Sequence, residues 1–125
     1  MSGLNLGFVL LFVKNPLLSK EFYGRLLKIR PVEESPTFVL FILPNGLKLG
    51  LWSLKTAEPP VTVTGGGCEL AFSEEDVDGV YAQWKQMGIP IAQAPTDMDF
   101  GRTFMATDPD GHRLRVFKLW EEERS

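Results

Sequence analysis

The feature that most constrains this sequence is a hairpin pattern that occurs twice. In residues 103–117 the turn sequence Asp-Pro-Asp-Gly separates an apolar run from a segment with alternating side chains, which is typical of a β-hairpin. Residues 38–52 repeat this arrangement around Pro-Asn-Gly. When the two turn sequences are aligned, Gly50 is equivalent to Arg115 and Trp52 to Phe117. A chain that repeats a hairpin in this way is expected to contain two copies of one module.

The first hairpin follows a strand and a helix. Residues 7–13 are continuously apolar, which predicts a strand covered on both faces. Asn15 and Pro16 are typical of a helix start, and Pro31 is expected to end that helix. Residues 32–34 are expected to form a short strand before the hairpin. The apolar stripe of the helix is expected to comprise Leu18, Phe22, Leu26 and Ile29.

The second hairpin follows the same elements. Residues 69–72 predict a strand, Asp76 is expected to cap a helix, and Gly88 and Pro90 are expected to end it. Residues 89–92 predict a short strand and residues 94–101 a loop. The apolar stripe of this helix is expected to comprise Val77, Val80, Tyr81, Trp84 and Met87.

This order predicts an α+β fold made of two βαβββ modules that form a curved sheet or barrel with an internal cavity. We expect one domain over residues 1–125, with one module at about 1–56, a linker at about 57–67 and the other module at about 68–120. The linker contains Gly65, Gly66 and Gly67. No helix start or Lys-Ser/Thr pair follows them, so we interpret them as linker rather than as a phosphate cradle.

The composition of the chain limits the classes of partner that it is expected to bind. With 125 residues and 44% hydrophobic residues the chain can bury one core, and its net charge of −3 argues against nucleic acid and anionic membranes as partners. Residues 4–13 are too short to span a bilayer. The lone Cys68 excludes an internal disulfide and suits a cytoplasmic location. It has no basic neighbour in the sequence that would activate it, so we expect a buried, inert thiol.

The sequence resembles the vicinal oxygen chelate superfamily of glyoxalases, dioxygenases and bleomycin-binding proteins. The resemblance covers essentially the whole chain and rests on residues 108–116, on residues 69–72 followed by Asp76-Val77-Asp78, and on residues 19–23. It implies a homodimer and a ligand cavity. In metal-using members, ligands lie seven residues before each helix cap and mid-way along each hairpin's last strand.

Carried onto this chain, the four metal-ligand positions hold Phe8, Gly50, Glu69 and Arg115. Only Glu69 is a ligand type, whereas a divalent site needs at least three protein donors. At about 4 Å and an effective dielectric near 20, Arg115 would repel each unit of metal charge by roughly 4 kcal/mol. These positions therefore predict a member with neither metal nor cofactor. The Asp-Phe-Gly-Arg run at residues 99–102 is similar to that of the metal-free subgroup related to phenazine-resistance proteins.

Glu69 and Arg115 are instead expected to form an ion pair inside the cavity, because a buried unpaired charge is costly. One interpretation is that the pair only neutralises itself. Another is that it also binds a carboxylate or amide of a ligand. A third is that Glu69 acts as a base, or as a metal ligand, in a lyase, isomerase or dioxygenase-like enzyme. The sole histidine, His112, lacks an obvious Ser or Cys partner and is a weak catalytic candidate.

The pocket is predicted to be aromatic. If Gly50 points inward, Trp52 does so too, and the missing side chain at position 50 is expected to open a slot along the indole for a flat guest. The alternative is that Trp52 and Phe8 fill the cavity as core. In the loop at residues 96–102, an Asp99 to Arg102 contact is expected and Phe100 is expected to close over a ring. The predicted ligand-binding residues are Phe8, Trp52, Glu69, Phe100, Arg115 and Phe117, and the predicted partner is a planar aromatic compound such as a phenazine-like antibiotic.

Overall fold

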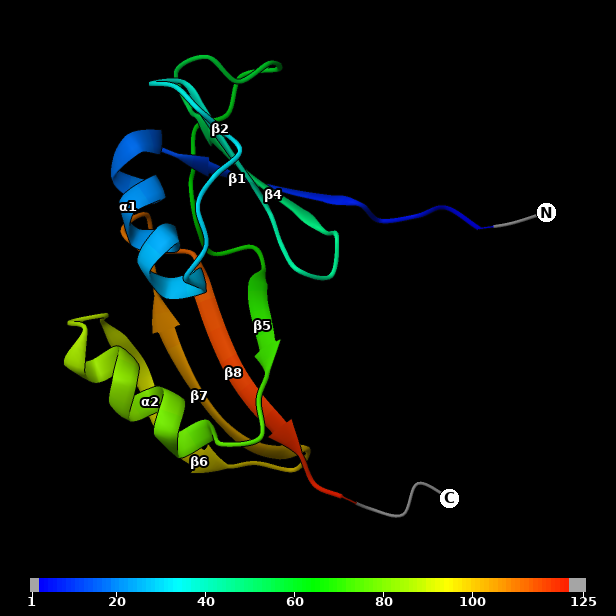
Figure 1. Ribbon diagram of the computed structural model, residues 1–125, viewed down its shortest axis with the longest axis vertical. Helices are drawn as coiled ribbons and strands as arrows, with labels where there is room; N and C mark the ends of the chain where they lie inside the picture. Colours follow the sequence, from blue (N-terminus) through cyan, green and yellow to red (C-terminus); the bar gives the residue numbers. More distant parts are fainter. Residues whose placement is uncertain (1–2, 122–125) are drawn as a thin grey trace. The chain divides into compact units, whose positions relative to one another are not determined.

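The structure is a computed structural model that describes residues 3–121 (Figure 1). Glu122 and Glu123 of the acidic C-terminal segment lie outside the described residues. The chain divides into two compact units, Met1–Thr64 and Gly65–Ser125. Each unit has the element order β-α-β-β-β, so the prediction of an α+β chain with two βαβββ modules is confirmed.

The first unit is a four-stranded mixed sheet with one helix. In its sheet the strand order is β1-β4-β3-β2, where β1 runs parallel to β4 and the other neighbours are antiparallel. The helix α1 packs on β3 and β4. The elements are β1 (Phe8–Val13), α1 (Pro16–Leu27), β2 (Glu33–Glu34), β3 (Phe38–Ile42) and β4 (Lys48–Ser53).

The second unit repeats this topology. Its strand order is β5-β8-β7-β6, with β5 parallel to β8, and α2 packs on β6, β7 and β8 (Figure 1). The elements are β5 (Glu69–Ser73), α2 (Val77–Gln86), β6 (Ile91–Asp97), β7 (Gly101–Thr107) and β8 (Arg113–Leu119). Each sheet keeps two edge strands, so each is an open curved sheet rather than a closed barrel.

Both helices begin where the caps predict. The side chain of Asn15 accepts a hydrogen bond from the Leu18 amide at 3.2 Å, and Asp76 accepts one from the Gly79 amide at 3.0 Å. These bonds satisfy amides that have no partner within the helix. The predicted end of α1 at Pro31 is wrong, because Lys28 adopts the left-handed conformation with φ 58° and its amide closes the helix on the Gly24 carbonyl.

The core of the first unit lies between α1 and its sheet. Tyr23 of the helix and Val39, Phe41 and Leu51 of the strands are fully buried. The predicted stripe of α1 is correct at Leu26 but wrong at Leu18, which is 56% exposed. The helix is turned so that Ser19 and Tyr23, rather than Leu18 and Phe22, face the sheet.

The core of the second unit is built around Phe104. The rings of Trp84 and Tyr81 pack edge-to-face on it, with centroid separations of 5.3 Å and 5.4 Å. Leu114 and Val116 of β8 are fully buried on the same side of the sheet. Edge-to-face pairs of this kind add to the stabilisation that area burial supplies, and they confirm that α2 presents its predicted apolar face.

Two strand predictions need correction. Residues 7–13 were expected to be covered on both faces, but β1 buries only Leu11 and Val13 fully, whereas Phe8 and Leu10 are about two-fifths exposed. The sequence does not show which face of β1 is buried, because every side chain in the strand is hydrophobic. The loop expected at 94–101 is also shorter, because β6 pairs with β7 as far as Asp97 through two irregularities in register.

Candidate functional site in the second unit and an aromatic face in the first

An ion pair joins β5 to β8 on the sheet face opposite α2. Parallel pairing sets Glu69 beside Arg113 and Ala71 beside Arg115, so Glu69 and Arg115 project diagonally from the same face. Arg115 Nε donates to Glu69 Oε1 at 2.7 Å, and a terminal nitrogen of Arg115 donates to Oε2 at 3.1 Å. The predicted pair therefore exists, and its two-point geometry is the strong form of such a contact.

Neighbouring strands hold Arg115 in place. Its other terminal nitrogen donates to Thr103 Oγ1 at 3.2 Å and lies 3.5 Å from Gln93 Oε1. The buried Thr103 hydroxyl in turn donates to the Val116 carbonyl at 2.8 Å. The side chain of Arg115 is only 17% exposed. Side chains from three other strands of the sheet thus hold Arg115 in place.

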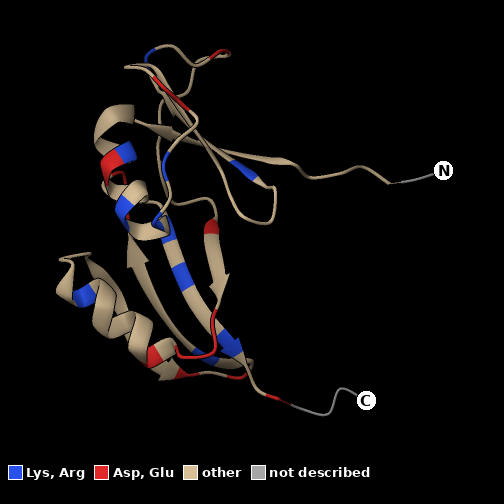
Figure 2. Ribbon diagram, viewed as in Figure 1, with Lys and Arg blue, Asp and Glu red and all other residues tan. Residues whose placement is uncertain are grey.

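Arg113 is the third member of this group, which we call the charged trio (Glu69, Arg113 and Arg115). A terminal nitrogen of Arg113 lies 2.6 Å from Glu69 Oε2, and its side chain is 44% exposed. Figure 2 shows basic segments along β8 and an acidic segment at the start of β5. Strand alternation places Arg113 on the face of Arg115, but its pairing with Glu69 depends on the β5–β8 register, which local sequence does not contain.

The two arginines of the trio lower the pKa of Glu69. The hydrogen bond from Arg115 lowers the pKa of Glu69, desolvation by burial opposes this effect, and the positive charges of Arg115 and Arg113 add to the lowering. The same pairing raises the pKa of Arg115. A carboxylate whose pKa is lowered in this way is a weak base at neutral pH. The geometry therefore favours an orienting role for Glu69 over proton abstraction.

In the first unit, the face opposite α1 is largely apolar. The centroid of the half-buried Trp52 ring lies 6.0 Å from that of Phe12, and Phe8 is 40% exposed. The prediction that Gly50 opens a slot beside Trp52 is wrong. A Cβ on Gly50 would lie 2.8 Å from Leu10, 2.9 Å from Phe8 and 3.0 Å from Phe38, so neighbouring side chains occupy the space. We call this apolar surface, formed by Phe8, Leu10, Phe12, Phe38 and Trp52, the aromatic face.

The remaining predicted ligand residues, Phe117 and Phe100, belong to the second unit. Phe117 lies two residues beyond Arg115 on the same face of β8 and is half-buried. Phe100 is 41% exposed in the turn between β6 and β7. The structure thus brings Glu69, Arg115 and Phe117 to one sheet face and places Phe8 and Trp52 together in the other unit.

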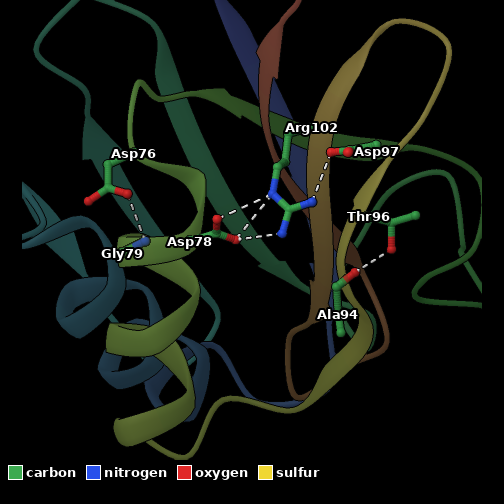
Figure 3. Close-up of polar contacts among 7 residues, drawn as sticks. All are labelled: Asp76, Asp78, Gly79, Ala94, Thr96, Asp97 and Arg102. Atoms are coloured by element: carbon green, nitrogen blue, oxygen red, sulfur yellow. Dashed lines mark hydrogen bonds and ion pairs between the residues drawn. The ribbon is translucent and has the colours of Figure 1, made fainter.

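The turn that carries Phe100 is braced by Arg102 (Figure 3). Arg102 donates to Asp97 at 2.8 Å and makes three hydrogen bonds of 3.1–3.3 Å to Asp78 near the start of α2. The predicted partner of Arg102 was Asp99, and this is corrected to Asp97 and Asp78. The reason is that Asp97 pairs with Arg102 across the β6–β7 ladder, so the two side chains share a face.

Cys68 and His112 also differ in environment. Cys68 was expected to be buried, but it is exposed, because it ends the glycine-rich segment that precedes β5. His112 is 5% exposed and follows the turn between β7 and β8. Its amide donates to Asp108 Oδ1 at 2.8 Å, which ties the residue to the turn.

The residues at the expected metal-ligand positions do not fit a divalent cation. Phe8 and Gly50 offer no side-chain donor, and both oxygens of Glu69 accept hydrogen bonds from arginines. Within residues 3–121, no three His, Cys, Asp or Glu side chains gather into a metal-binding group. A divalent cation at Glu69 would have to displace two guanidinium groups that already neutralise the carboxylate.

The repeated βαβββ topology is that of the glyoxalase-like proteins. Residues 5–116 match the Glyoxalase/Bleomycin resistance protein/Dioxygenase superfamily, and the chain belongs to that superfamily. No helix among the described residues is long and apolar enough to cross a membrane.

Individual proteins are also similar to this chain. The chain is 34% identical over 116 residues to the phenazine antibiotic resistance protein EhpR of Enterobacter agglomerans. This match covers 88% of each of the two chains. It is 54% identical to protein ATC0852 from Agrobacterium tumefaciens, whose solution NMR structure has a TM-score of 0.84 and covers 91% of this chain and 96% of that one. A glyoxalase/bleomycin resistance protein/dioxygenase from Nocardioides, 22% identical over 98% of this chain and 88% of that one, has a TM-score of 0.85 and shows the shared fold.

Proposed function

We propose that this protein is a metal-independent binding protein that sequesters a planar aromatic compound, such as a phenazine-like antibiotic. The similarity to EhpR supports this proposal, because that protein is a phenazine antibiotic resistance protein and the similarity extends over 88% of both chains. The observation that carries it is the aromatic face, where Trp52 and Phe12 lie together and Phe8 is two-fifths exposed. An apolar ring-lined surface of this kind is suited to a flat conjugated guest.

The first unit supplies aromatic contacts. Stacking of an aromatic guest on a ring adds roughly 0.5 to 1.5 kcal/mol per pair beyond the burial of its area. The charged trio offers fixed polar groups, which orient a ligand rather than provide most of its affinity. Phe100 and Phe117 add further rings. Binding would protect the cell by lowering the free concentration of the compound, without a chemical reaction.

Titration with phenazine tests this function. Phenazine is expected to quench the tryptophan fluorescence of the wild-type protein, and Trp52→Ala is expected to weaken binding by about tenfold, which corresponds to loss of one stacked ring. The control is Leu18→Ala, which truncates an exposed apolar side chain on α1 and should leave the dissociation constant unchanged. Wild-type protein that binds no phenazine at millimolar concentration would contradict the proposal.

Metal independence and the absence of a reaction are tested on the same complex. EDTA is expected to leave the dissociation constant unchanged, because the proposed contacts involve no metal ion. Mass spectrometry of phenazine released after prolonged incubation is expected to return the unmodified compound. A modified product would favour the alternative of a lyase, isomerase or dioxygenase-like enzyme that uses Glu69.

We also propose a cytoplasmic homodimer. The open edges of the two sheets, β1 and β2 in the first unit and β5 and β6 in the second, support pairing between chains. Native mass spectrometry at micromolar concentration is expected to show a dimer. The single cysteine is consistent with a reducing compartment.

A further inference from the structure

A cavity lies in the first unit, where α1 ends and the chain turns back toward β2. It has a volume of about 570 Å³ and is lined by the second half of α1, by residues 29–31 and by Glu34 of β2. Pockets that hold a small molecule usually measure about 300 to 1,000 Å³. We call this space the α1–β2 cavity. None of its lining residues belongs to the aromatic face or to the charged trio, so the proposed function does not explain it.

The lining of the α1–β2 cavity has an excess of positive charge. Three basic residues, Lys20, Arg25 and Arg30, and two acidic residues, Glu21 and Glu34, contribute to it. The Lys20 ammonium lies 3.5 Å from a carboxylate oxygen of Glu21 and 3.6 Å from one of Glu34. Figure 2 shows basic and acidic segments next to each other on α1. Because one lysine contacts both carboxylates, the net charge of the lining resides on the two arginines.

The two arginines differ in what the fold explains about them. Arg25 lies in the last turn of α1, where a cation stabilises the negative end of the helix dipole. Arg30 lies three residues beyond the end of the helix, so this effect does not account for it. It is exposed, and it makes no ion pair with any residue in the range 3–121. The fold therefore gives no structural reason for an arginine at position 30.

Gly24 is unexpected in the interior of α1. Glycine destabilises a helix interior relative to alanine, because it loses more backbone freedom on folding. The packing does not require glycine here, since an added Cβ would lie 3.6 Å from the carbonyl oxygen of Ile29, which is an ordinary contact. Gly24 does line the α1–β2 cavity, and a side chain at this position would take up part of its volume. The glycine is thus explained by the room that it leaves in the cavity.

We infer that the α1–β2 cavity binds a small phosphorylated molecule. Arg25 and Arg30 bind its phosphate group, and the half-buried Ile29 and Pro31 contact its organic part. One guanidinium fork occupies both oxygens of a carboxylate, whereas a phosphate has enough oxygens for two forks. A doubly charged phosphate also gains more from the net positive lining than a carboxylate does. This site is separate from the aromatic face, and the inference does not depend on the proposed function.

Isothermal titration with AMP and adenosine tests the inference, because the two probes differ only in the phosphate. The wild-type protein is expected to bind AMP with a dissociation constant of about 1 mM or lower, and adenosine at least about tenfold more weakly. Ribose 5-phosphate is expected to bind within about tenfold of AMP, since the phosphate supplies most of the affinity. Equal binding of AMP and adenosine, or no binding of AMP at millimolar concentration, would overturn the inference.

Variants of the lining locate the site. Arg30→Gln is expected to weaken AMP binding by about tenfold. The matched control is Lys118→Gln, which removes a positive charge from β8 in the second unit and should leave AMP binding unchanged. Both variants should bind phenazine as the wild type does. An Arg30→Gln protein that binds AMP as tightly as the wild type would overturn the inference and leave the proposed function standing.

Gly24→Ala separates binding from folding. The added methyl group is expected to weaken AMP binding several-fold, because it takes up part of the cavity. It is expected to leave the midpoint of urea denaturation unchanged or to raise it, because alanine is the better helix former. A Gly24→Ala protein with unaltered AMP affinity would contradict the site, since the cavity would then not be where AMP binds.

Discussion

The guanidinium of Arg115 binds both carboxylate oxygens of Glu69, at 2.7 Å and 3.1 Å. At the matching positions of the first unit, Phe8 lies against Gly50. One repeated topology thus produces an ion pair on one sheet and a ring-covered glycine on the other. The difference comes entirely from the side chains, because both pairs are diagonal neighbours across parallel strands.

Glu69→Gln is expected to lower the free energy of unfolding at pH 7 by about 1 to 2 kcal/mol. The substitution leaves the partly buried Arg115 and the more exposed Arg113 without a counter-charge, and hydrogen bonds to charged groups are worth about that much. Urea denaturation measures the change. The control Glu75→Gln alters an exposed carboxylate that lies 3.6 Å from Lys118, and should change stability little.

The same variant has a predicted dependence on pH. Since Arg115 lowers the pKa of Glu69 in the folded protein, Glu69 contributes stability above its ordinary, unfolded pKa of about 4.5. That contribution is lost as the pH falls through the lower folded value. The stability difference between wild type and Glu69→Gln is therefore expected to be full at pH 6–7 and to shrink below about pH 4. A difference that grows on acidification would contradict the ion pair.

Two glycine substitutions are expected to differ in cost. At Gly50 an added Cβ meets the ends of flexible side chains, so Gly50→Ala should change stability by less than about 1 kcal/mol while it displaces the Phe8 ring. At Gly101 an added Cβ meets the backbone of Lys118 and Leu119, which cannot move aside. Gly101→Ala is therefore expected to destabilise by about 1 to 3 kcal/mol in urea denaturation. Equal costs would show that the two sites are packed alike.

Asp108 is expected to stabilise the turn between β7 and β8. Its Oδ1 accepts hydrogen bonds of 2.8 Å from the amides of Asp110 and His112, and the residue is 4% exposed. Asp108→Ala should cost about 1 to 3 kcal/mol, because two amides lose their acceptor. Asp108→Asn keeps an oxygen at this position and should cost less. Thermal denaturation of the two variants compares them.

Arg102→Leu is expected to loosen the turn that carries Phe100. Arg102 connects Asp97 at the end of β6 to Asp78 of α2, and Met98 and Gly101 close the turn with backbone hydrogen bonds. Without this connection, the amides of Met98 and Gly101 should exchange with deuterium several-fold faster. Lys118→Leu serves as the control. Unchanged exchange in Arg102→Leu would show that the ladder alone holds the turn.

The sequence by itself determined the elements and much of the site. Two turn motifs, two helix caps and the alternation of β4 and β8 predicted both modules, because turns, caps and strand periodicity depend on residues close together in the chain. The pairing of Glu69 with Arg115 also followed from the sequence. It came from the resemblance to a known superfamily, combined with the cost of burying an unpaired charge.

Only the tertiary structure decided which side chains meet across strands. The parallel register of β5 and β8 sets Arg113 beside Glu69. The β6–β7 ladder places Arg102 beside Asp97 rather than beside Asp99. Likewise, the space beside Gly50 is filled by Phe8, Leu10 and Phe38 from two other strands. These relationships join residues that are distant in sequence or depend on side-chain rotamers, and no local pattern encodes either.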